Sequence, residues 1–354
     1  MSQLWTPDAD LRPSNWIVPV RAMRLHQPAQ VEQAPLRLER VADPTPGPGD
    51  LVLQVHCCGV CRTDLHIVEG ELPARRSPLI PGHEVVGRVV SRGSGTESFA
   101  IGDRAGVAWL HSACGECGFC RRERENLCED PALTGWTVDG GYAELTKVPA
   151  AFAYRIPDGF ADEQAAPLLC AGIIGYRSLR LCGIQPGERL GLYGFGAAAH
   201  IAIQVARHWG CAVYVSTRGA ANRELARALG AQWVGGSRDR PPEKLHASII
   251  FAPAGELAPH ALRSLEKGGT VALAGIHMSD IPSMDYREHL YHERILRSVT
   301  NATRADGREL LALASKIPLR MQTTSFPLSA ANEALVALKH GRFTGAAVLD
   351  CRGD

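Results

Sequence analysis

The sequence lacks long hydrophobic runs: its longest apolar stretches have the length of a strand, whereas a membrane-spanning helix needs roughly 20 apolar residues. Its first residues, MSQLWTPDADLRPSNW, lack the basic segment and apolar stretch of a secretory signal. Charge of one sign is also missing, because 38 Lys and Arg balance 37 Asp and Glu, and no basic block occurs that would neutralise nucleic-acid phosphates. We therefore expect a cytoplasmic protein that binds neither membranes nor nucleic acid.

Cysteine is too sparse for a disulfide scaffold, with 11 in 354 residues, yet its positions are clustered. Four cysteines fall in residues 114–128 and three in residues 57–61, which indicates metal binding. The length exceeds the roughly 250 to 300 residues that one hydrophobic core usually serves. The sequence thus predicts two domains and a metal site.

The pattern of apolar and polar residues changes near residue 170. Residues 21–149 consist of short alternating or apolar runs broken by Gly, Pro and Asp, which predicts a mostly β domain. From there to about residue 302, strand-like runs alternate with helical patterns, including a helix expected over 258–269, and this alternation predicts a parallel sheet. The tail resumes the first texture and is expected to pack back onto that half, and the first twenty residues are expected to form an extended arm.

Four closely spaced cysteines form the clearest motif, Cys114-x2-Cys117-x2-Cys120-x7-Cys128. The glycines between them permit the tight turns that bring thiolates to one ion, so the motif predicts a closed, structural zinc site. An iron–sulfur cluster also takes four thiolates, and the spacing does not separate the two metals. A zinc ribbon that binds nucleic acid is disfavoured, because the nearby arginines alternate with glutamates.

A second set of candidate ligands is spread along the chain. Cys61 and His83 both stand where a strand-like run meets a loop, and Cys170 opens the α/β half. Together they would give a Cys2His zinc shell with a fourth position open, which is the pattern of catalytic zinc. Each residue alone has a simpler interpretation, since Cys often packs as a small buried hydrophobe and a lone His more often belongs to the core.

A glycine-rich turn follows the strand-like run RLGLY and opens a helical stretch. It fits the G-x-G-x-x-G/A pattern of dinucleotide-binding turns and consists of Gly194, Phe195, Gly196, Ala197, Ala198 and Ala199. The next strand ends in Ser216, Thr217 and Arg218 rather than in an acid that would bind the ribose of NAD. Hydroxyls and a guanidinium suit a 2′-phosphate, so NADP is favoured over NAD. The simpler interpretations are a tight turn and a solvated loop arginine.

These motifs together resemble the zinc-dependent alcohol dehydrogenases of the medium-chain dehydrogenase/reductase family over residues 22–350. Besides the four-cysteine lobe, the resemblance rests on CGVCRTDLH (58–66), PGHEVVGRVV (81–90), DGGYAEL (139–145), LLCAG (168–172), EKGGTVALAGI (266–276) and TRADGREL (303–310). It implies an α/β protein with a GroES-like, mostly β catalytic domain at 1–167 and 303–354. This domain would include a structural zinc lobe near 112–130, and a Rossmann domain with a doubly wound parallel sheet would span 168–302.

The resemblance implies two zinc ions per chain. Cys61, His83 and Cys170 would bind the catalytic ion. Glu84 would enter its shell transiently, and Asp64 would orient the His83 imidazole as carboxylates commonly do for zinc-bound histidines. The four cysteines of the lobe would hold the second ion.

The resemblance also implies the remaining parts of a hydride-transfer site, for reversible exchange between a small or medium primary alcohol or aldehyde and NAD(P) (class EC 1.1.1). Thr63 and His66 would relay the proton, and Arg62 would contact the cofactor pyrophosphate. Further cofactor contacts are expected at Gly275 and Ile276. The substrate pocket is expected to include Trp109, Leu110 and Ile174.

Three positions depart from the family pattern. Ile174 stands where many relatives have Thr, Ala346 stands where many have Arg, and position 217 lacks the acid of strictly NAD-using members. Two alternatives stay open: a zinc-independent quinone or enoyl reductase of the same family, and a non-catalytic member that binds NADP. A homodimer or homotetramer is expected, as in relatives.

Overall fold

The computed structural model describes residues 19–353, which fall into two compact units. The first comprises the described residues up to Leu169 together with those from Thr323 onward, and the second is Cys170–Gln322. The division therefore groups residues 303–322 with the second unit, whereas the sequence assigned them to the first. The extended arm expected at the N-terminus lies almost entirely outside the described residues. No described helix has the length and apolar character needed to span a membrane.

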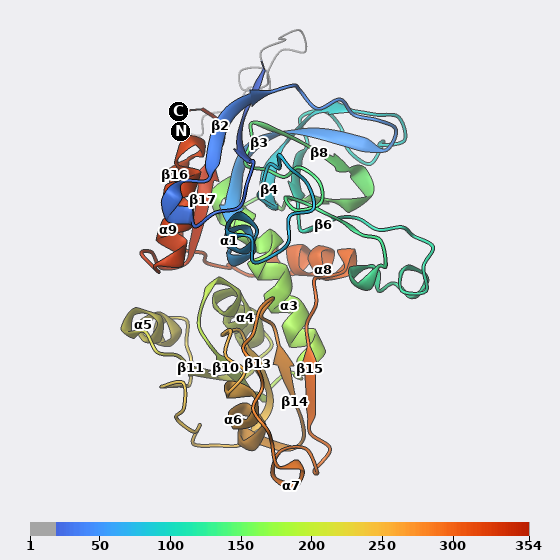
Figure 1. Cartoon of the computed structure of the whole chain (residues 1–354). Helices are drawn as coiled ribbons and strands as arrows, with labels where there is room; N and C mark the ends of the chain where they lie inside the picture. The colour runs from blue at the N-terminus through green and yellow to red at the C-terminus, as the bar shows by residue number, and fades with distance from the viewer. Residues whose placement is uncertain (1–18, 354) are drawn as a thin grey trace, which may run out of the picture. The chain divides into compact units, whose positions relative to one another are not determined.

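The first unit is built on a seven-stranded, mainly antiparallel sheet (Figure 1). Its strands are β3 (Asp50–Val60), β4 (Glu84–Arg92), β5 (Arg104–Val107), β8 (Leu145–Pro149), β9 (Ala153–Arg155), β16 (Thr323–Pro327) and β17 (Ala346–Asp350). Two smaller antiparallel pairs are β1 (Val20–Leu25) with β2 (Leu36–Val41), and β6 (Leu110–Ser112) with β7 (Ala132–Leu133). Because β17 pairs antiparallel with β3, the tail packs back onto the first half of the chain, as expected.

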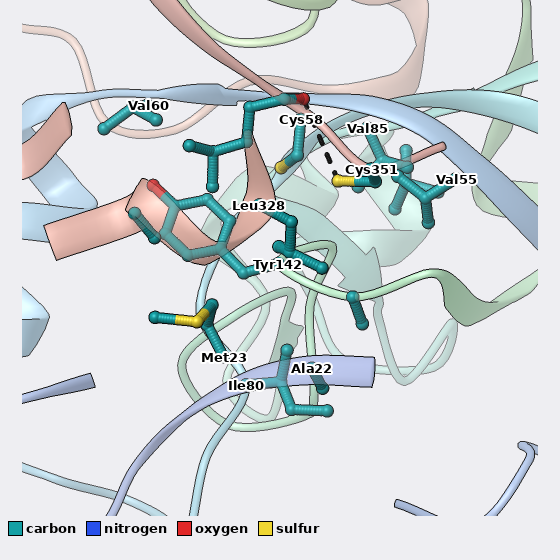
Figure 2. Packing of buried hydrophobic residues seen from close by; sticks show 14 of the residues in the cluster. Ala22, Met23, Val55, Cys58, Val60, Ile80, Val85, Tyr142, Leu328 and Cys351 are labelled. Carbon is teal, nitrogen blue, oxygen red and sulfur yellow. Dashed lines mark hydrogen bonds between the residues drawn. The ribbon is translucent and has the colours of Figure 1, made fainter. Parts of the chain in front are cut away.

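The helices of this unit are short. They are α1 (Arg62–Glu69), α2 (Asp162–Ala165) and α9 (Ala331–Lys339), with 3₁₀ turns η1 (Val31–Gln33), η2 (Cys120–Arg122), η3 (Glu125–Leu127), η4 (Ala150–Phe152), η5 (Ala166–Leu169) and η6 (Leu328–Ala330). The hydrophobic core includes buried residues along the whole length of β3. Figure 2 shows the part of this core around Met23, Cys58, Val85 and Tyr142. Burial of this apolar area is the main stabilising contribution to the unit.

The second unit contains a six-stranded parallel sheet in the order β12-β11-β10-β13-β14-β15 (Figure 1). The strands are β10 (Arg189–Tyr193), β11 (Ala212–Ser216), β12 (Trp233–Gly235), β13 (Leu245–Ile250), β14 (Leu265–Leu273) and β15 (Ile295–Ser298). The helices are α3 (Ala171–Cys182), α4 (Ala197–His208), α5 (Ala220–Ala228), α6 (Leu257–Ser264), α7 (Tyr286–His289) and α8 (Arg304–Ala314). This is the strand order 3-2-1-4-5-6 of the doubly wound dinucleotide-binding fold. The predicted fold class is confirmed.

One expected helix is shorter than the sequence suggested. The helix predicted over 258–269 is α6, which ends at Ser264, and Leu265 already begins β14. Leu265 pairs with Leu245 of β13, and Gly268 has a left-handed backbone that no helix interior adopts. Strand pairing across the sheet therefore overrides the local helical pattern.

Candidate active site

Cys61, His83, Glu84 and Cys170 lie together, with one potential ligand atom from each within 4.8 Å of the others. Cys61 follows β3 and is the N-cap of α1, while His83 and Glu84 stand at the beginning of β4. Antiparallel pairing of β3 with β4 brings these two strand ends side by side. Cys170 directly follows η5, whose residues are buried and contact both β3 and β4.

Asp64 fixes the orientation of two members of this cluster. Its Oδ1 lies 3.0 Å from His83 Nδ1, and its Oδ2 accepts a hydrogen bond of 2.9 Å from the backbone N–H of Cys61. The opposite ring nitrogen, His83 Nε2, lies 3.3 Å from the Cys61 sulfur. Asp64 and His83 are 0% and 1% exposed. A carboxylate bound to Nδ1 leaves Nε2 directed at a metal position, which is the usual arrangement around zinc-bound histidines.

The electrostatics of the cluster favour a bound cation. Burial raises the pKa of Asp64, and the charge of His83 only partly opposes that shift. Burial lowers the pKa of His83, but Asp64 and Cys61 raise it by more, so its net shift is upward. Glu84, only 2% exposed, adds another acidic group. Several acidic groups gathered in a largely buried site favour a positive partner, and cysteine with histidine is a donor set that zinc prefers.

The loop that carries His83 is packed backbone to backbone against residues 139–142. Gly82 has a φ of +93°, and a Cβ at Gly140 would lie 2.0 Å from the Gly82 carbonyl oxygen. That oxygen accepts a hydrogen bond of 2.9 Å from Gly141 N–H, and Tyr142 N–H donates to the Pro81 carbonyl at 3.0 Å. Only glycine fits at these two contact points. The position of His83 is therefore fixed by backbone contacts as well as by Asp64.

The first turns of α1 carry three of the predicted site residues. Thr63 is buried, and its N–H donates to the Cys61 sulfur at 3.3 Å. Arg62 is exposed, whereas the His66 side chain is 18% exposed and is hydrogen-bonded through Nδ1 to Glu71. The helix thus brings Thr63 into contact with Cys61 and carries His66 one turn further along.

The four cysteines of the lobe also converge, with their sulfurs within 4.8 Å of one another. Cys114 Sγ lies 3.5 Å from Cys128 Sγ and 3.9 Å from Cys120 Sγ. The N–H of Cys114 donates to the Cys128 sulfur at 3.3 Å, and the N–H of Cys117 donates to the Cys114 sulfur at the same distance. Four thiols this close together could hold one metal ion, and four thiolates are the donor set of structural zinc sites.

The glycine-rich turn connects β10 to α4. Gly194 has a φ of +88°, and a Cβ there would lie 2.9 Å from Ala252 N. Gly196 is the N-cap of α4, and a Cβ there would meet no atom within 4 Å, so space is open at this helix end. Phe195 points inward and is 2% exposed, while Ala199 is fully buried on α4. The open helix N-terminus suits a phosphate group.

The end of β11 lies beside this turn, since the Ser216 carbonyl accepts a hydrogen bond of 2.9 Å from Gly194 N–H. Ser216 and Thr217 are 3% and 5% exposed, and Arg218 is exposed. Of the two cofactor residues expected after β14, Gly275 is half-buried and Ile276 is 55% exposed. No acidic side chain stands at residues 216–218.

The residues predicted for the substrate pocket have different surroundings. Trp109 is half-buried, and its ring meets the His83 imidazole edge-on with centroids 4.9 Å apart. Leu110 is 4% exposed and belongs to the hydrophobic core of the first unit. Ile174 lies half-buried near the start of α3. Trp109 is therefore the one of these residues that contacts a candidate metal ligand in the described structure.

Two family models match the chain: the alcohol dehydrogenase GroES-like domain over residues 47–158 and the zinc-binding dehydrogenase over residues 197–316. The chain is 50% identical over 333 residues to the probable alcohol dehydrogenase AdhA of Mycobacterium tuberculosis (strain CDC 1551 / Oshkosh). This alignment covers 93% of this chain and 96% of the relative. It is 35% identical over 328 residues to an alcohol dehydrogenase of Geobacillus stearothermophilus, with 90% and 96% covered. The chain belongs to the zinc-type alcohol dehydrogenases of the medium-chain dehydrogenase/reductase family.

A solved structure agrees with this alcohol dehydrogenase fold. The cobalt- and zinc-bound thermostable alcohol dehydrogenase of Pyrobaculum aerophilum is 25% identical and superposes with a TM-score of 0.84, over 94% of this chain and 100% of that one. The two-unit architecture is thus shared almost from end to end.

Sequence reasoning missed two residues of this alcohol dehydrogenase. The Trp136 ring stacks on Trp109, with centroids 5.9 Å apart and planes 14° apart, and its Nε1–H donates to the Pro73 carbonyl at 3.0 Å. Glu71 hydrogen-bonds to His66 Nδ1. Trp136 lies in the GW step just before the block DGGYAEL, and Glu71 comes two residues after α1, so neither has a motif of its own.

Proposed function

We propose that this chain is an NAD(P)-dependent zinc alcohol dehydrogenase that interconverts small or medium primary alcohols and aldehydes. The observation that carries the proposal is the set of Cys61, His83 and Asp64, in which the buried imidazole is bound by a buried carboxylate on one side and faces the Cys61 thiol on the other. That arrangement prepares a metal ligand, and metal chemistry suits the polarisation of an alcohol or aldehyde oxygen.

Cys61, His83 and Cys170 would hold the catalytic zinc, with Glu84 able to enter its shell, and the four lobe cysteines would hold a second ion. A zinc ion with an open position supplies Lewis acidity, which lowers the pKa of a bound alcohol toward neutrality. The side chains of the protein would orient the ligands and set the charge around this ion. Asp64 keeps the ring of His83 in one orientation, and thiolates at Cys61 and Cys170 set the charge of the site.

The substrate would lie against aromatic side chains. Trp109 adjoins His83, and Trp136 extends the same surface outward by stacking on Trp109. Two stacked indoles give a flat apolar surface, which suits an aliphatic or aromatic alcohol better than a polyol. Thr63 and His66 on α1 would take the proton that oxidation releases and pass it to solvent.

The cofactor would bind at the turn between β10 and α4. The open space at Gly196 and the free amides of the helix end suit its pyrophosphate, with Arg62 as a further contact. Ser216, Thr217 and Arg218 offer hydroxyls and a guanidinium for a 2′-phosphate, so we propose NADP as the preferred cofactor. The homodimer or homotetramer and the cytoplasmic location remain predictions.

The cofactor proposal is tested by measuring kcat/KM for a panel of aldehydes with NADPH and with NADH, on wild-type protein and on Arg218→Ala. We expect a preference for NADPH in the wild type and a loss of roughly 10- to 100-fold with NADPH in the variant, because a charged hydrogen bond contributes about 1.5–3 kcal/mol. Arg227→Ala, at an exposed arginine of the neighbouring helix α5, is the matched control and should change neither value. A wild-type preference for NADH would contradict the assignment.

The metal proposal is tested by counting zinc in the wild type and in Cys61→Ser. We expect two ions per chain in the wild type, and one in the variant together with loss of nearly all alcohol oxidation. One zinc in an active wild type would favour a zinc-independent reductase. Cofactor binding without turnover of any alcohol or aldehyde would favour a non-catalytic protein.

A further inference from the structure

His200 is the fourth residue of α4, the helix that begins at the glycine-rich turn. Its side chain is 4% exposed, and its Nε2 lies 3.2 Å from the carbonyl oxygen of Phe195. The two rings also pack together, with centroids 4.7 Å apart and planes 53° apart. One buried side chain of the helix thus contacts both the backbone and the ring of the residue that separates Gly194 from Gly196.

The chemistry of this contact defines the state of the imidazole. A carbonyl oxygen only accepts hydrogen bonds, so the hydrogen in the contact belongs to His200 Nε2. Burial lowers the pKa of His200 to about 4, and the hydrogen bond to Phe195 opposes that shift only in part. The ring is therefore neutral near pH 7, and its effect on the turn is one of geometry and not of charge.

The bond from His200 fixes the direction of the peptide unit that joins Phe195 to Gly196. In a trans peptide the C=O and the N–H point in opposite directions. Because the Phe195 carbonyl is directed at a side chain of α4, the N–H of Gly196 is directed away from that side chain. No described residue accepts a hydrogen bond from this N–H, and a Cβ at Gly196 would meet no atom within 4 Å. The N–H is thus available to an anion at the open end of α4.

The strands of the sheet hold only the residues of the turn that precede this peptide. The N–H of Gly194 donates to the Ser216 carbonyl of β11 at 2.9 Å. Among the described residues, the donor to the next carbonyl, that of Phe195, is the His200 ring. Loss of this ring would leave the buried carbonyl without a donor and the peptide without its fixed direction.

We propose that His200 is a positioning residue for cofactor binding, and that its Nε2–H orients the Phe195–Gly196 peptide so that the Gly196 N–H binds the pyrophosphate of NAD(P). The inference rests on the proposed cofactor site at the turn between β10 and α4. The role is one of binding alone, and no covalent bond forms or breaks at the imidazole.

The first test measures the Kd of NADPH and of NADH by calorimetry for the wild type, His200→Leu, His200→Gln and His289→Leu. We expect a rise of roughly 5- to 10-fold in His200→Leu for the dinucleotide that the wild type prefers, which is the usual effect of one neutral hydrogen bond. Glutamine keeps an N–H donor and should recover much of the affinity. His289 is the matched control, because it is also buried and its Nδ1 lies 2.7 Å from a backbone carbonyl, that of Asp285 in the first turn of α7.

The second test separates the pyrophosphate from the rest of the cofactor. ADP-ribose contains the pyrophosphate and adenosine does not, so His200→Leu should bind ADP-ribose more weakly and adenosine as the wild type does. A general disturbance of the second unit would weaken both ligands. In steady-state kinetics the KM for the dinucleotide should rise in parallel with its Kd, and kcat at saturating cofactor should not fall.

The third test reads the tautomer by nitrogen-15 NMR of the histidine-labelled wild type, with His200→Gln to assign the signal. We expect a neutral ring with its hydrogen on Nε2 from pH 6 to pH 8. A charged ring or an Nδ1–H tautomer would overturn the inference, whether or not the leucine variant folds. Unchanged affinity of His200→Leu for ADP-ribose, or equal losses for ADP-ribose and adenosine, would also overturn it while the alcohol dehydrogenase function stands. A wild type that binds neither NADPH nor NADH would instead overturn the proposed function.

Discussion

The Asp64 carboxylate binds two different groups with its two oxygens, the His83 ring and the Cys61 backbone. Replacement by alanine removes both bonds and leaves a buried imidazole nitrogen without its acceptor. We expect Asp64→Ala to weaken binding of one zinc ion roughly 10- to 100-fold, because the carboxylate partner of a metal-bound histidine contributes about that much to affinity. Competition with a chelating dye, followed as zinc released per chain, measures the effect.

The control for this variant is Asp64→Asn, which keeps the volume and one acceptor oxygen and should lose less affinity. Asp158→Ala, at an exposed aspartate, should lose none. If Asp64→Ala folds with wild-type circular dichroism and keeps both zinc ions at the same chelator concentration, Asp64 does not orient the ligand.

Single residues differ in how well the sequence predicted their surroundings. The spacing of the four lobe cysteines confines them to one short loop, so their convergence followed from local geometry. The roles assigned to Cys61, His83 and Cys170 stay predictions, although the structure brings these residues together. Trp136 was missed because its partner Trp109 lies 27 positions away on another loop, and no local pattern indicates such a stack.

At the scale of elements, α8 is attached to α3 through one buried carboxylate. Asp306 is 1% exposed, accepts hydrogen bonds from the N-cap Thr303, and binds Arg177 at 2.5 Å. We expect Asp306→Ala to lower the free energy of unfolding of the second unit by about 3–5 kcal/mol, since Arg177 is left nearly buried without its counter-charge. Urea unfolding followed by hydrogen exchange in α3 and α8 measures this.

The matched control is Glu309→Gln, which removes an exposed ion pair of 3.1 Å with Arg180 and should cost less than about 1 kcal/mol. Equal effects of the two substitutions would mean that the Asp306 pair does not stabilise the packing of α8 on α3.

The four-cysteine lobe has little hydrophobic support around its short turn η3, whose buried residues are Glu125 and Asn126. We expect Cys117→Ser to release one zinc ion and to make residues 113–130 sensitive to protease while far-ultraviolet circular dichroism stays nearly unchanged. Cys211→Ser, at a buried cysteine outside both clusters, is the control. Visible absorption of an iron–sulfur cluster in the purified protein would contradict zinc at this site.

Elements with a regular hydrophobic periodicity were predictable from the sequence. Elements whose boundaries depend on residues far away in the sequence were not. The alternation of strands and helices from β10 to β13 follows the pattern in the sequence. The end of α6 does not follow the pattern in the sequence, because Leu265 already belongs to β14 and pairs there with Leu245 of β13. The contact of α8 with α3 through Asp306 and Arg177 joins residues 129 positions apart, so no local pattern indicates it.

At the scale of the whole molecule, acid stability depends in part on Asp162. Burial acts to raise the pKa of this carboxyl, but the hydrogen bond from His56 and the charge of Arg104 lower it to about 2. Because this value lies below the ordinary 3.8, the stabilisation is fully present above about pH 4 and is lost as the pH falls toward 2. It amounts to roughly 2 kcal/mol, at 1.36 kcal/mol per pKa unit.

We therefore expect Asp162→Asn to be less stable than the wild type at pH 6, with the difference shrinking between pH 4 and pH 2. Urea unfolding at a series of pH values measures it, and the metal content of both proteins is determined at each pH so that metal loss is accounted for. Asp158→Asn, in the same connection but exposed, should show no such trend. A difference that stays constant down to pH 2 would contradict the shifted pKa.

The contact between Gly82 and Gly140 limits how new substrate ranges arise, in nature or in the laboratory. Because the backbones of residues 81–82 and 140–142 are in direct contact, there is no room for an inserted residue or a redesigned loop. Any shift on one side displaces His83 on the other. The indole rings at 109 and 136 are better places for variation, because they contact each other through side chains and not through the backbone. A mutant library that randomises these two positions and leaves 80–83 and 139–142 intact would therefore vary this aromatic surface while the backbone that holds His83 stays in place.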